Sequence, residues 1–516
     1  MGIKIAVRPV LVSCCALAVL AAAGPARAQV TIDEFPVPTG GSRPYTIVAG
    51  PDGALWFTES IGNKIGRINT KGVFHEFNVP TGESGPYGIA TGADGNIWFT
   101  ERFGDQIGRF EFLGQHITEF PIPTPFAQAW EIAPGADGLL YFTEEDVHQI
   151  GMINTDGLIQ QEVPIGSFGF PTGIAPGSDA KMWFTIEIGD MIGRIDGFGQ
   201  IDTFPYSQNQ TLPWDITPGP DGNLWFSELA GRAIGRMTTA GTTTEFPIPG
   251  DFSGIAGVAA GWDGNIWYTE NDTNHVGSID LNGTILPKYD TGERPLSITP
   301  GPDGNMWFTV ADGNAIGRVN IATPGDGYVI STDGGFSPKR RIMKMGQTAH
   351  WMFVGPKAHS VADTSGLNLF DSGPKTMVSY FNQVLTAAGT YPYMDGEPGG
   401  TLAAEINVPV NAPSTATVNV PFTVTWATQS EPLIMAFDAQ VQTPGAPDFV
   451  PWITTPASIL SADYTAPTPG KYRFRARLRN TETGAALGYW PPTWVIVDPA
   501  KPGPIVRSAG PSPDKR

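Results

Sequence analysis

The chain has 516 residues, several times the ~100–200 residues of one domain, so we expect two to four domains. It holds 64 glycines and 48 prolines and only 16% charged residues, which excludes long amphipathic helices and coiled coils. Its 41% hydrophobic content, with 14 Trp and 28 Phe, excludes a disordered chain. The net charge of −19 argues against nucleic acid and anionic membrane surfaces as partners, because an acidic protein repels phosphate groups.

The first 28 residues have the pattern of a secretory signal peptide. Lys4 and Arg8 precede an apolar stretch at 10–23, and small residues surround a cleavage site at Ala28. We therefore expect cleavage after Ala28 and a secreted or periplasmic protein. Both cysteines, Cys14 and Cys15, would leave with this segment, so the mature chain would have no disulfide. No later segment approaches the ~20 apolar residues needed for membrane insertion.

An aromatic anchor recurs seven times between residues 30 and 320. The successive spacings are 42, 43, 42, 42, 42 and 40 residues, and the anchors are Trp56, Trp98, Tyr141, Trp183, Trp225, Trp267 and Trp307. Each repeat contains an entry run such as "PYGI", a "GADGN" turn, and runs such as "IWFTE", "IGRI" and "EFPIP". Four short strands in about 42 residues are typical of a β-propeller blade. The Asp-Gly pair in most turns favours a two-residue hairpin.

The phase of the repeat predicts how the ring closes. Residues 31–38, "TIDEFPVP", resemble the fourth strand of a repeat but precede the first one, whereas the seventh repeat ends after Val319. The sequence therefore predicts an all-β protein with a seven-bladed β-propeller at 29–322, closed by its N-terminal strand. Alternating strand-like runs predict two further β-sandwich domains, at 323–410 and 411–498, and residues 499–516 are predicted to be a disordered tail.

Two series of repeat residues are predicted to meet at one end of the central channel. The entry runs supply the aromatic residues Tyr45, Tyr87, Trp130 and Trp214, and the ends of the "WFTE" runs supply the carboxylates Glu59, Glu101, Glu144, Glu228 and Glu270. Aromatic faces beside carboxylates suit a cationic, ring-bearing or protein ligand, or a divalent cation. No cofactor is certain from this pattern, although Mg²⁺ or Ca²⁺ could bind at the channel face. The alternative is that the glutamates only stabilise the blades.

The repeat "GPDGNLWFSELAGRAIGRMTTAGTTTEFPIP" resembles that of the virginiamycin B lyase family, which are seven-bladed propellers. The resemblance implies a Mg²⁺-dependent carbon–oxygen lyase that opens streptogramin B lactones with a catalytic histidine. The two functional histidines of that family fall here at Ala256 and Leu296, and its last-blade acidic site falls at Val310 and Ala311. His148 and His275 remain candidates for a relocated base.

The runs "GFSPKRRIMKMGQTAHWMFVGPKAHSV" and "AAGTYPYMDG" resemble a cupredoxin. A type 1 copper site needs two His and a Cys, but only His359 stands at a ligand position and Asp395 replaces the cysteine. The third domain looks like an immunoglobulin or fibronectin III sandwich, an interaction module without chemistry of its own. The sequence therefore favours a secreted, non-catalytic ligand-binding protein over a lyase, and both over a copper redox protein.

Overall fold

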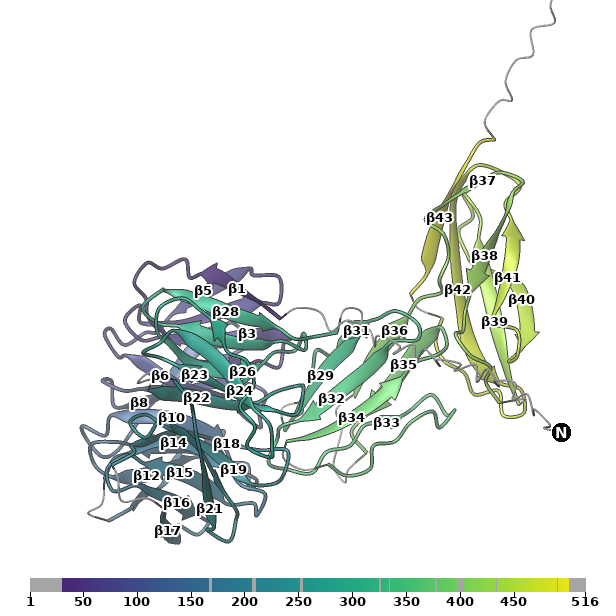
Figure 1. Cartoon of the computed structure of the whole chain (residues 1–516). Coiled ribbons are helices and arrows are strands. Elements are labelled where there is room, and N and C mark those ends of the chain that lie inside the picture. The colour runs from purple at the N-terminus through teal and green to yellow at the C-terminus, as the bar shows by residue number, and fades with distance from the viewer. Residues whose placement is uncertain are drawn as a thin grey trace, which may run out of the picture.

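The computed structural model describes residues 30–500, except 167–168, 207–209, 251–253, 324–325, 334, 376–377, 397–402, 433 and 490. The predicted signal peptide and all but two residues of the predicted tail lie outside this range. The described residues form strands and no helix. They follow one another as a group of seven sheets, a middle domain and a terminal domain (Figure 1).

Seven antiparallel four-stranded sheets account for residues 30–320, in an arrangement that fits a propeller. The innermost strands are β2 (Pro44–Ala49), β6 (Pro86–Thr91), β10 (Ala129–Pro134), β14 (Pro171–Pro176), β18 (Pro213–Pro218), β22 (Ile255–Ala260) and β26 (Pro295–Pro300). The second strands, which carry the aromatic anchors, are β3 (Ala54–Glu59), β7 (Ile97–Glu101), β11 (Leu140–Glu144), β15 (Met182–Ile186), β19 (Leu224–Glu228), β23 (Ile266–Glu270) and β27 (Met306–Val310).

The outer strands complete each sheet. The third strands are β4 (Lys64–Asn69), β8 (Gln106–Glu111), β12 (Gln149–Ile153), β16 (Met191–Ile195), β20 (Ala233–Met237), β24 (His275–Ile279) and β28 (Ala315–Asn320). The outermost strands of six sheets are β5 (Phe74–Asn78), β9 (His116–Pro121), β13 (Ile159–Pro164), β17 (Ile201–Pro205), β21 (Thr243–Pro247) and β25 (Tyr289–Asp290). In the sheet of β26, β27 and β28, the outermost strand is β1 (Thr31–Pro36) from the start of the described chain.

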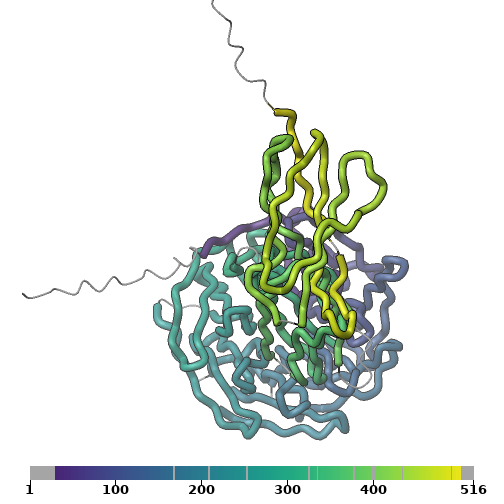
Figure 2. The backbone as a smooth tube through the Cα atoms, turned by 90° about the vertical axis from the view of Figure 1, so that its right-hand side faces the viewer, coloured from purple at the N-terminus to yellow at the C-terminus, as the bar shows by residue number. Residues whose placement is uncertain are grey.

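The innermost strands surround a central channel. Each packs beside the innermost strand of the next sheet, and β26 packs beside β2. In the view of Figure 2, the seven sheets form a ring that lies behind the two later domains.

The turn between the first and second strands is held by the aromatic anchor. In the first sheet, Trp56 donates its indole N–H to Asp52 at 3.0 Å, and the Arg67 guanidinium pairs with the same aspartate at 2.6 Å. The loop closes with Gly50 N–H to Ala54 O, and Gly53 has a φ of 77°. It therefore has three residues with a left-handed glycine, and the expected two-residue hairpin is wrong.

The middle domain consists of two four-stranded sheets. One contains β30 (Gly335–Ser337), β29 (Gly327–Thr332), β32 (Thr348–Phe353) and β34 (Ser379–Val384). The other contains β31 (Arg340–Ile342), β36 (Ala403–Val408), β35 (Gly389–Met394) and β33 (Ala362–Asp363).

The terminal domain has a five-stranded sheet and a two-stranded sheet. The first contains β37 (Thr415–Thr417), β43 (Thr493–Asp498), β42 (Gly470–Asn480), β39 (Met435–Gln442) and β40 (Val450–Pro456), and the second contains β38 (Pro421–Thr425) and β41 (Ser461–Thr465).

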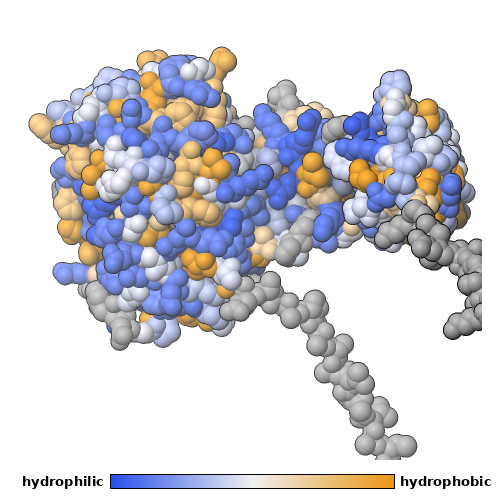
Figure 3. Space-filling model, turned by 90° about the horizontal axis from the view of Figure 1, so that it is seen from above, coloured by the Kyte–Doolittle hydropathy of each residue, from blue (hydrophilic) through white to orange (hydrophobic). Residues whose placement is uncertain are grey.

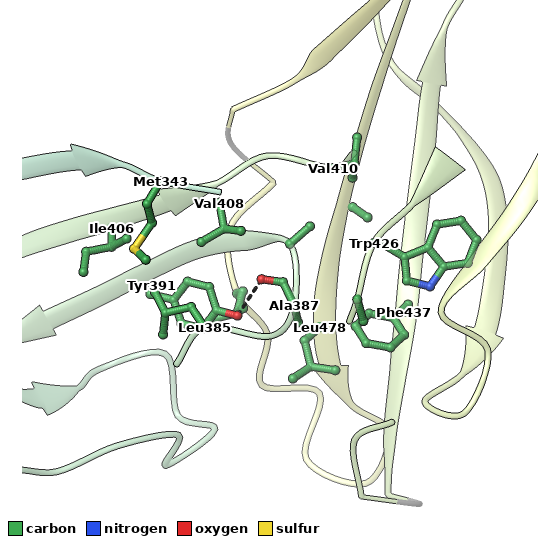
Figure 4. Close-up of a cluster of buried hydrophobic side chains, with 14 of the residues drawn as sticks. Met343, Leu385, Ala387, Tyr391, Ile406, Val408, Val410, Trp426, Phe437 and Leu478 are labelled. Atoms are coloured by element: carbon green, nitrogen blue, oxygen red, sulfur yellow. Dashed lines mark hydrogen bonds between the residues drawn. The ribbon is translucent and has the colours of Figure 1, made fainter. Parts of the chain in front are cut away.

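One continuous hydrophobic core joins the middle and terminal domains. It extends from Ile406 in β36 through Leu385 to Trp426, Phe437 and Leu478 (Figure 4). Backbone hydrogen bonds also cross the junction, since Ala388 N–H donates to Trp426 O at 2.8 Å and Thr390 N–H donates to Gly488 O at 3.0 Å. These two domains therefore share one core and are not separated by a linker.

The middle domain is docked on the face of the propeller that carries the Asp-Gly turns. Ser337 donates its hydroxyl to Gly50 O at 2.7 Å, and Tyr380 donates to Gly261 O at 2.6 Å. Trp262 also packs edge-on against Tyr328, with ring centroids 5.2 Å apart. We call this covered side the turn face, and the opposite side, where the innermost strands begin, the entry face.

In the view from above, no part of the surface is uniformly apolar. Hydrophilic and hydrophobic side chains are interspersed over the propeller and both later domains (Figure 3). Within the described part of the chain, no helical segment has the length and hydropathy for crossing a bilayer.

Candidate functional site

The four aromatic entry residues come together at the centre of the entry face. Tyr45 lies 4.3 Å from Tyr87 between ring centroids, Tyr87 lies 5.1 Å from Trp130, and Trp130 lies 5.1 Å from Trp214 in an edge-on arrangement. Each comes from the first two residues of a different innermost strand, so the repeat itself brings them to one level of the channel. We call these four side chains the aromatic layer.

A cation of the protein's own already covers part of this layer. The Arg102 guanidinium lies 4.1 Å from the Trp130 ring centroid and 5.1 Å from that of Tyr87. It is held by the Glu145 carboxylate at 2.5 Å and donates to Gln128 Oε1 at 3.1 Å. Burial, opposed by Arg102, raises the pKa of Glu145 to about 7. Arg102 thus occupies the cation-binding face that the sequence pattern offered to a ligand.

A cavity of about 240 Å³ opens beside the aromatic layer on the entry face. Besides the four aromatic residues, its walls are Arg43, Arg102, Leu229, Ala256, Asn271, Arg294 and Leu296. Arg43 and Arg294 share one counter-ion, Asp312, at 3.9 and 3.6 Å. The cavity therefore combines ring faces with guanidinium groups, which suits a ring-bearing ligand with electronegative groups.

The five predicted glutamates do not join the aromatic layer. These residues are at most 1% exposed and line neither channel cavity. Four of them lie near a glutamate from the outermost strand of the same sheet, in the pairs Glu59–Glu76, Glu101–Glu119, Glu144–Glu162 and Glu228–Glu245. Burial, followed by this neighbouring carboxylate, raises the pKa of Glu59 to about 7 and those of Glu101, Glu144 and Glu228 to about 8. Their place in the molecule is inside the blades.

The glutamates of the outermost strands have a structural role, because they bind the loop that leads into their sheet. Glu119 accepts the Thr81 N–H at 2.7 Å and the Thr81 hydroxyl at 3.0 Å, and Glu76 makes the same two bonds with Thr39. In each case the threonine lies in the loop that leads into the sheet. The sixth sheet differs, because Lys288 forms an ion pair with Glu270 there.

Neither candidate histidine base lines the channel. His148 has a φ of 55° in the turn before β12, and its ring packs on Phe170 at 5.1 Å. His275 begins β24, with Nε2 at 3.2 Å from Asp290 and Nδ1 at 3.8 Å from Glu270. Both rings are absent from the walls of the two channel cavities.

The positions of the two family histidines are apolar and close together. Ala256 and Leu296 pack with Ala311 in one buried cluster, against which Tyr45 and Trp214 also pack. Among the described residues, no group of three His, Cys, Asp or Glu side chains could hold a metal ion. The residues of this entry face therefore do not fit the Mg²⁺ and histidine chemistry that the resemblance implies, and we derive no step through a metal.

Two carboxyl groups that the repeat pattern did not indicate lie deeper in the channel. Glu131 on β10 and Asp215 on β18 directly follow the two tryptophans of the aromatic layer, at a position that is Gly or a small hydroxyl residue in the other blades. Burial and then Asp215 raise the pKa of Glu131 to about 8, and burial raises that of Asp215 to about 6. An acidic residue at an otherwise small inward position was the signal that could have identified them.

The predicted copper ligand His359 is held between two carboxylates. Its Nε2 lies 2.8 Å from Asp333 Oδ1 and its Nδ1 lies 2.8 Å from Asp395 Oδ2. Burial alone would lower the pKa of His359, but the two aspartates raise it above its ordinary value. Both ring nitrogens are thus engaged by carboxylates, and Asp395, at the cysteine position of a copper site, is one of the two partners.

Comparisons with known proteins agree on the propeller. The model of the Virginiamycin B lyase family matches residues 20–231 and 131–351. A solved streptogramin B lyase is 34% identical, with a TM-score of 0.54, over 58% of this chain and 99% of its own. The virginiamycin B lyase of Staphylococcus aureus is 32% identical, with a TM-score of 0.54, over 56% and 99%, as is a catalytically inactive variant of it with quinupristin. The chain therefore belongs to the virginiamycin B lyase family.

Proposed function

We propose that this protein is a non-catalytic binding protein that uses the lyase-like propeller as a scaffold. The carrying observation is that four aromatic side chains converge on the entry face, while the two family histidine positions are the buried, apolar Ala256 and Leu296. A general base contributes ~10²–10⁴-fold to a proton abstraction, so its replacement by apolar side chains removes the chemistry but leaves the binding surface.

The proposed ligand is a ring-bearing small molecule, or a protein segment that presents such a ring. The entry cavity offers the faces of Tyr87 and Trp130 and the guanidinium groups of Arg43 and Arg294. A cationic ligand has less support than the sequence suggested, because Arg102 already lies over Trp130. Ca²⁺ or Mg²⁺ also has less support, because the five glutamates lie inside their blades and do not line the cavity.

Quinupristin is a suitable probe because a structure of the related S. aureus lyase variant includes it. We expect titration with quinupristin to change the tryptophan fluorescence of the mature protein, and Trp130→Ala to weaken binding at least about tenfold, as for an aromatic anchor. The matched control is Trp494→Ala, since Trp494 is 52% exposed in the terminal domain. Equal binding by Trp130→Ala, or loss of binding by Trp494→Ala alone, would contradict the assignment to the entry face.

Two alternatives have weaker support. A Mg²⁺-dependent carbon–oxygen lyase with His148 or His275 as base is supported by family membership, but both histidines lie outside the channel walls. A copper redox protein would need His359 as a ligand, although Asp333 and Asp395 already engage both of its nitrogens.

We also propose the folds of the three domains and the cellular location of the protein. We infer a seven-bladed propeller closed by β1, which is supported by its pairing with β28 from Thr31–Asn320 to Pro36–Ala315. The middle domain is taken as cupredoxin-like and the terminal one as Ig- or fibronectin III-like, on the basis of their two-sheet packing. Secretion rests on the sequence of residues 1–28.

A further inference from the structure

A second cavity, of about 290 Å³, lies on the other side of the aromatic layer. Its side walls are the innermost strands of the propeller, and its floor is the middle domain on the turn face, through residues such as Ile330, Val354 and Pro356. Tyr45, Trp130, Trp214 and Leu296 line both this cavity and the entry cavity, so the aromatic layer separates them. We call this second cavity the channel chamber.

The side walls of the chamber are mostly hydrocarbon. They include Ile89, Ile132, Ile174, Val258 and Ile298, one from each of five innermost strands. A cavity with such walls favours the aliphatic or aromatic body of an organic molecule. It does not favour Ca²⁺ or Mg²⁺, which need six or more oxygen ligands, many of them water.

Two carboxyl groups also lie on these walls. Glu131 and Asp215 project from β10 and β18, and the strand between them, β14, carries only Gly173 at the same level. Asp215 accepts the N–H groups of Ile216 at 2.8 Å and Val258 at 2.9 Å. Glu131 accepts the Ile132 N–H at 3.2 Å and has the Thr46 hydroxyl at 3.4 Å. These bonds fix both groups in place and leave each with further lone pairs for a ligand.

A third carboxylate enters from the floor. Asp333 of the middle domain lines the chamber, and its side chain is only 4% exposed. His359 holds its Oδ1 at 2.8 Å, whereas its buried Oδ2 has no hydrogen-bond partner among the described residues and lies 3.9 Å from the Lys357 ammonium. A buried carboxylate oxygen without a donor is costly, and a ligand that donates to it would remove that cost.

We propose that the channel chamber binds a small aliphatic amine, whose ammonium group is recognised by Glu131 and Asp215 and whose hydrocarbon body packs on the isoleucine and valine walls. The middle domain acts as the floor of this site, and the His359–Asp333 contact positions the third carboxylate. The overall charge of −19 adds to the attraction for a cation. This site is separate from the proposed entry-face site, because the aromatic layer lies between them.

The protonation state of Glu131 gives amine binding a measurable signature. The titratable groups that face it are Tyr45, Glu131, Asp215 and Asp333. With a pKa raised to about 8, Glu131 is largely protonated at pH 7. An ammonium ion beside it favours the carboxylate, so amine binding at pH 7 should release up to one proton into the buffer.

The test is calorimetric titration of the mature protein with 1,5-diaminopentane, pentylamine and 1-pentanol, at pH 7 in two buffers of different ionisation enthalpy. We expect both amines to bind with proton release and the alcohol not to bind. Glu131→Gln and Asp215→Asn should each weaken amine binding at least about tenfold, and Glu131→Gln should abolish the proton release. Glu101→Gln, a buried carboxyl outside the chamber, is the matched control and should bind normally.

Val48→Phe provides a variant that changes no charge. Val48 lines the chamber and is half-buried, so the larger ring should fill part of the space and weaken amine binding. Absence of amine binding, equal affinity for 1-pentanol, or unchanged affinity in both carboxyl variants would overturn the proposal.

Discussion

The buried carboxyl pair of Glu101 and Glu119 predicts that this protein is more stable in mild acid than in mild base. The Glu101 side chain is fully buried on β7, next to Glu119 of β9, and its pKa is raised from 4.5 to about 8. Near pH 4.5 the folded protein keeps this proton and about half of the unfolded chains carry it, so the buried acid costs little. As the pH rises from 4.5 through 8, the unfolded chain loses this proton first, so folding becomes progressively less favourable.

The magnitude follows from the shift. At about 1.4 kcal/mol per pKa unit, the change from 4.5 to about 8 corresponds to an upper bound of ~5 kcal/mol. Relaxation and water entry around the ionised pair reduce such costs, so we expect Glu101→Gln to stabilise the protein by ~1–3 kcal/mol at pH 8.5. The amide has the same shape and can donate to Glu119, and at pH 4.5 the variant and the wild type should be about equally stable.

The assay is thermal unfolding of both proteins at pH 4.5, 6.5 and 8.5. For a protein of this size, ~1–3 kcal/mol corresponds to a Tm higher by a few degrees at pH 8.5. Glu270→Gln is the control, because Glu270 pairs with Lys288 and its neutralisation should lower the Tm. A Glu101→Gln variant that is less stable than the wild type at pH 8.5 would refute the structural role assigned to this pair.

Three further predictions test other parts of the molecule. A chain that starts at Gly40 lacks β1, exposes the edge of β28, and should aggregate or unfold at least ~10 °C below the mature protein; an unchanged Tm would contradict closure by β1. His359→Gln should destabilise the protein by ~1–3 kcal/mol at pH 5.5, and the loss should shrink as the pH rises through the raised pKa of His359, because only the imidazolium is stabilised by the two aspartates; a loss that grows with pH would contradict it. Protein loaded with Cu²⁺ should show no intense visible charge-transfer band, whereas one tightly held copper that His359→Ala releases would overturn this expectation.

Most of the repeat could be predicted because its signals are local and occur seven times. The spacing of the anchors identified the sheets, and the early "TIDEFPVP" run anticipated a fourth strand that pairs with β28. The turn was assigned the wrong length, since Asp-Gly occurs both in two-residue hairpins and in three-residue loops such as that between Gly50 and Ala54. Only the backbone pairing distinguishes them.

The site was predicted only in part because side-chain direction depends on neighbouring strands. Tyr45 and Trp130 were placed correctly at one level, since they begin equivalent innermost strands. Glu101 ends a second strand at nearly the same height, but its carboxyl group turns into the blade toward Glu119, a partner 18 positions later that strand register brings alongside. The docking of the middle domain under Glu131 depends on contacts between distant segments, which no local pattern reveals.

Mass spectrometry of quinupristin incubated with the mature protein and Mg²⁺ tests the central claim most directly. The account predicts that the cyclic antibiotic stays intact, at the rate of the buffer control, while the same sample shows binding that depends on Trp130. Formation of a linear product with a new unsaturated end group, faster than in buffer, would show that a base acts at this entry face despite Ala256 and Leu296, and would contradict the account.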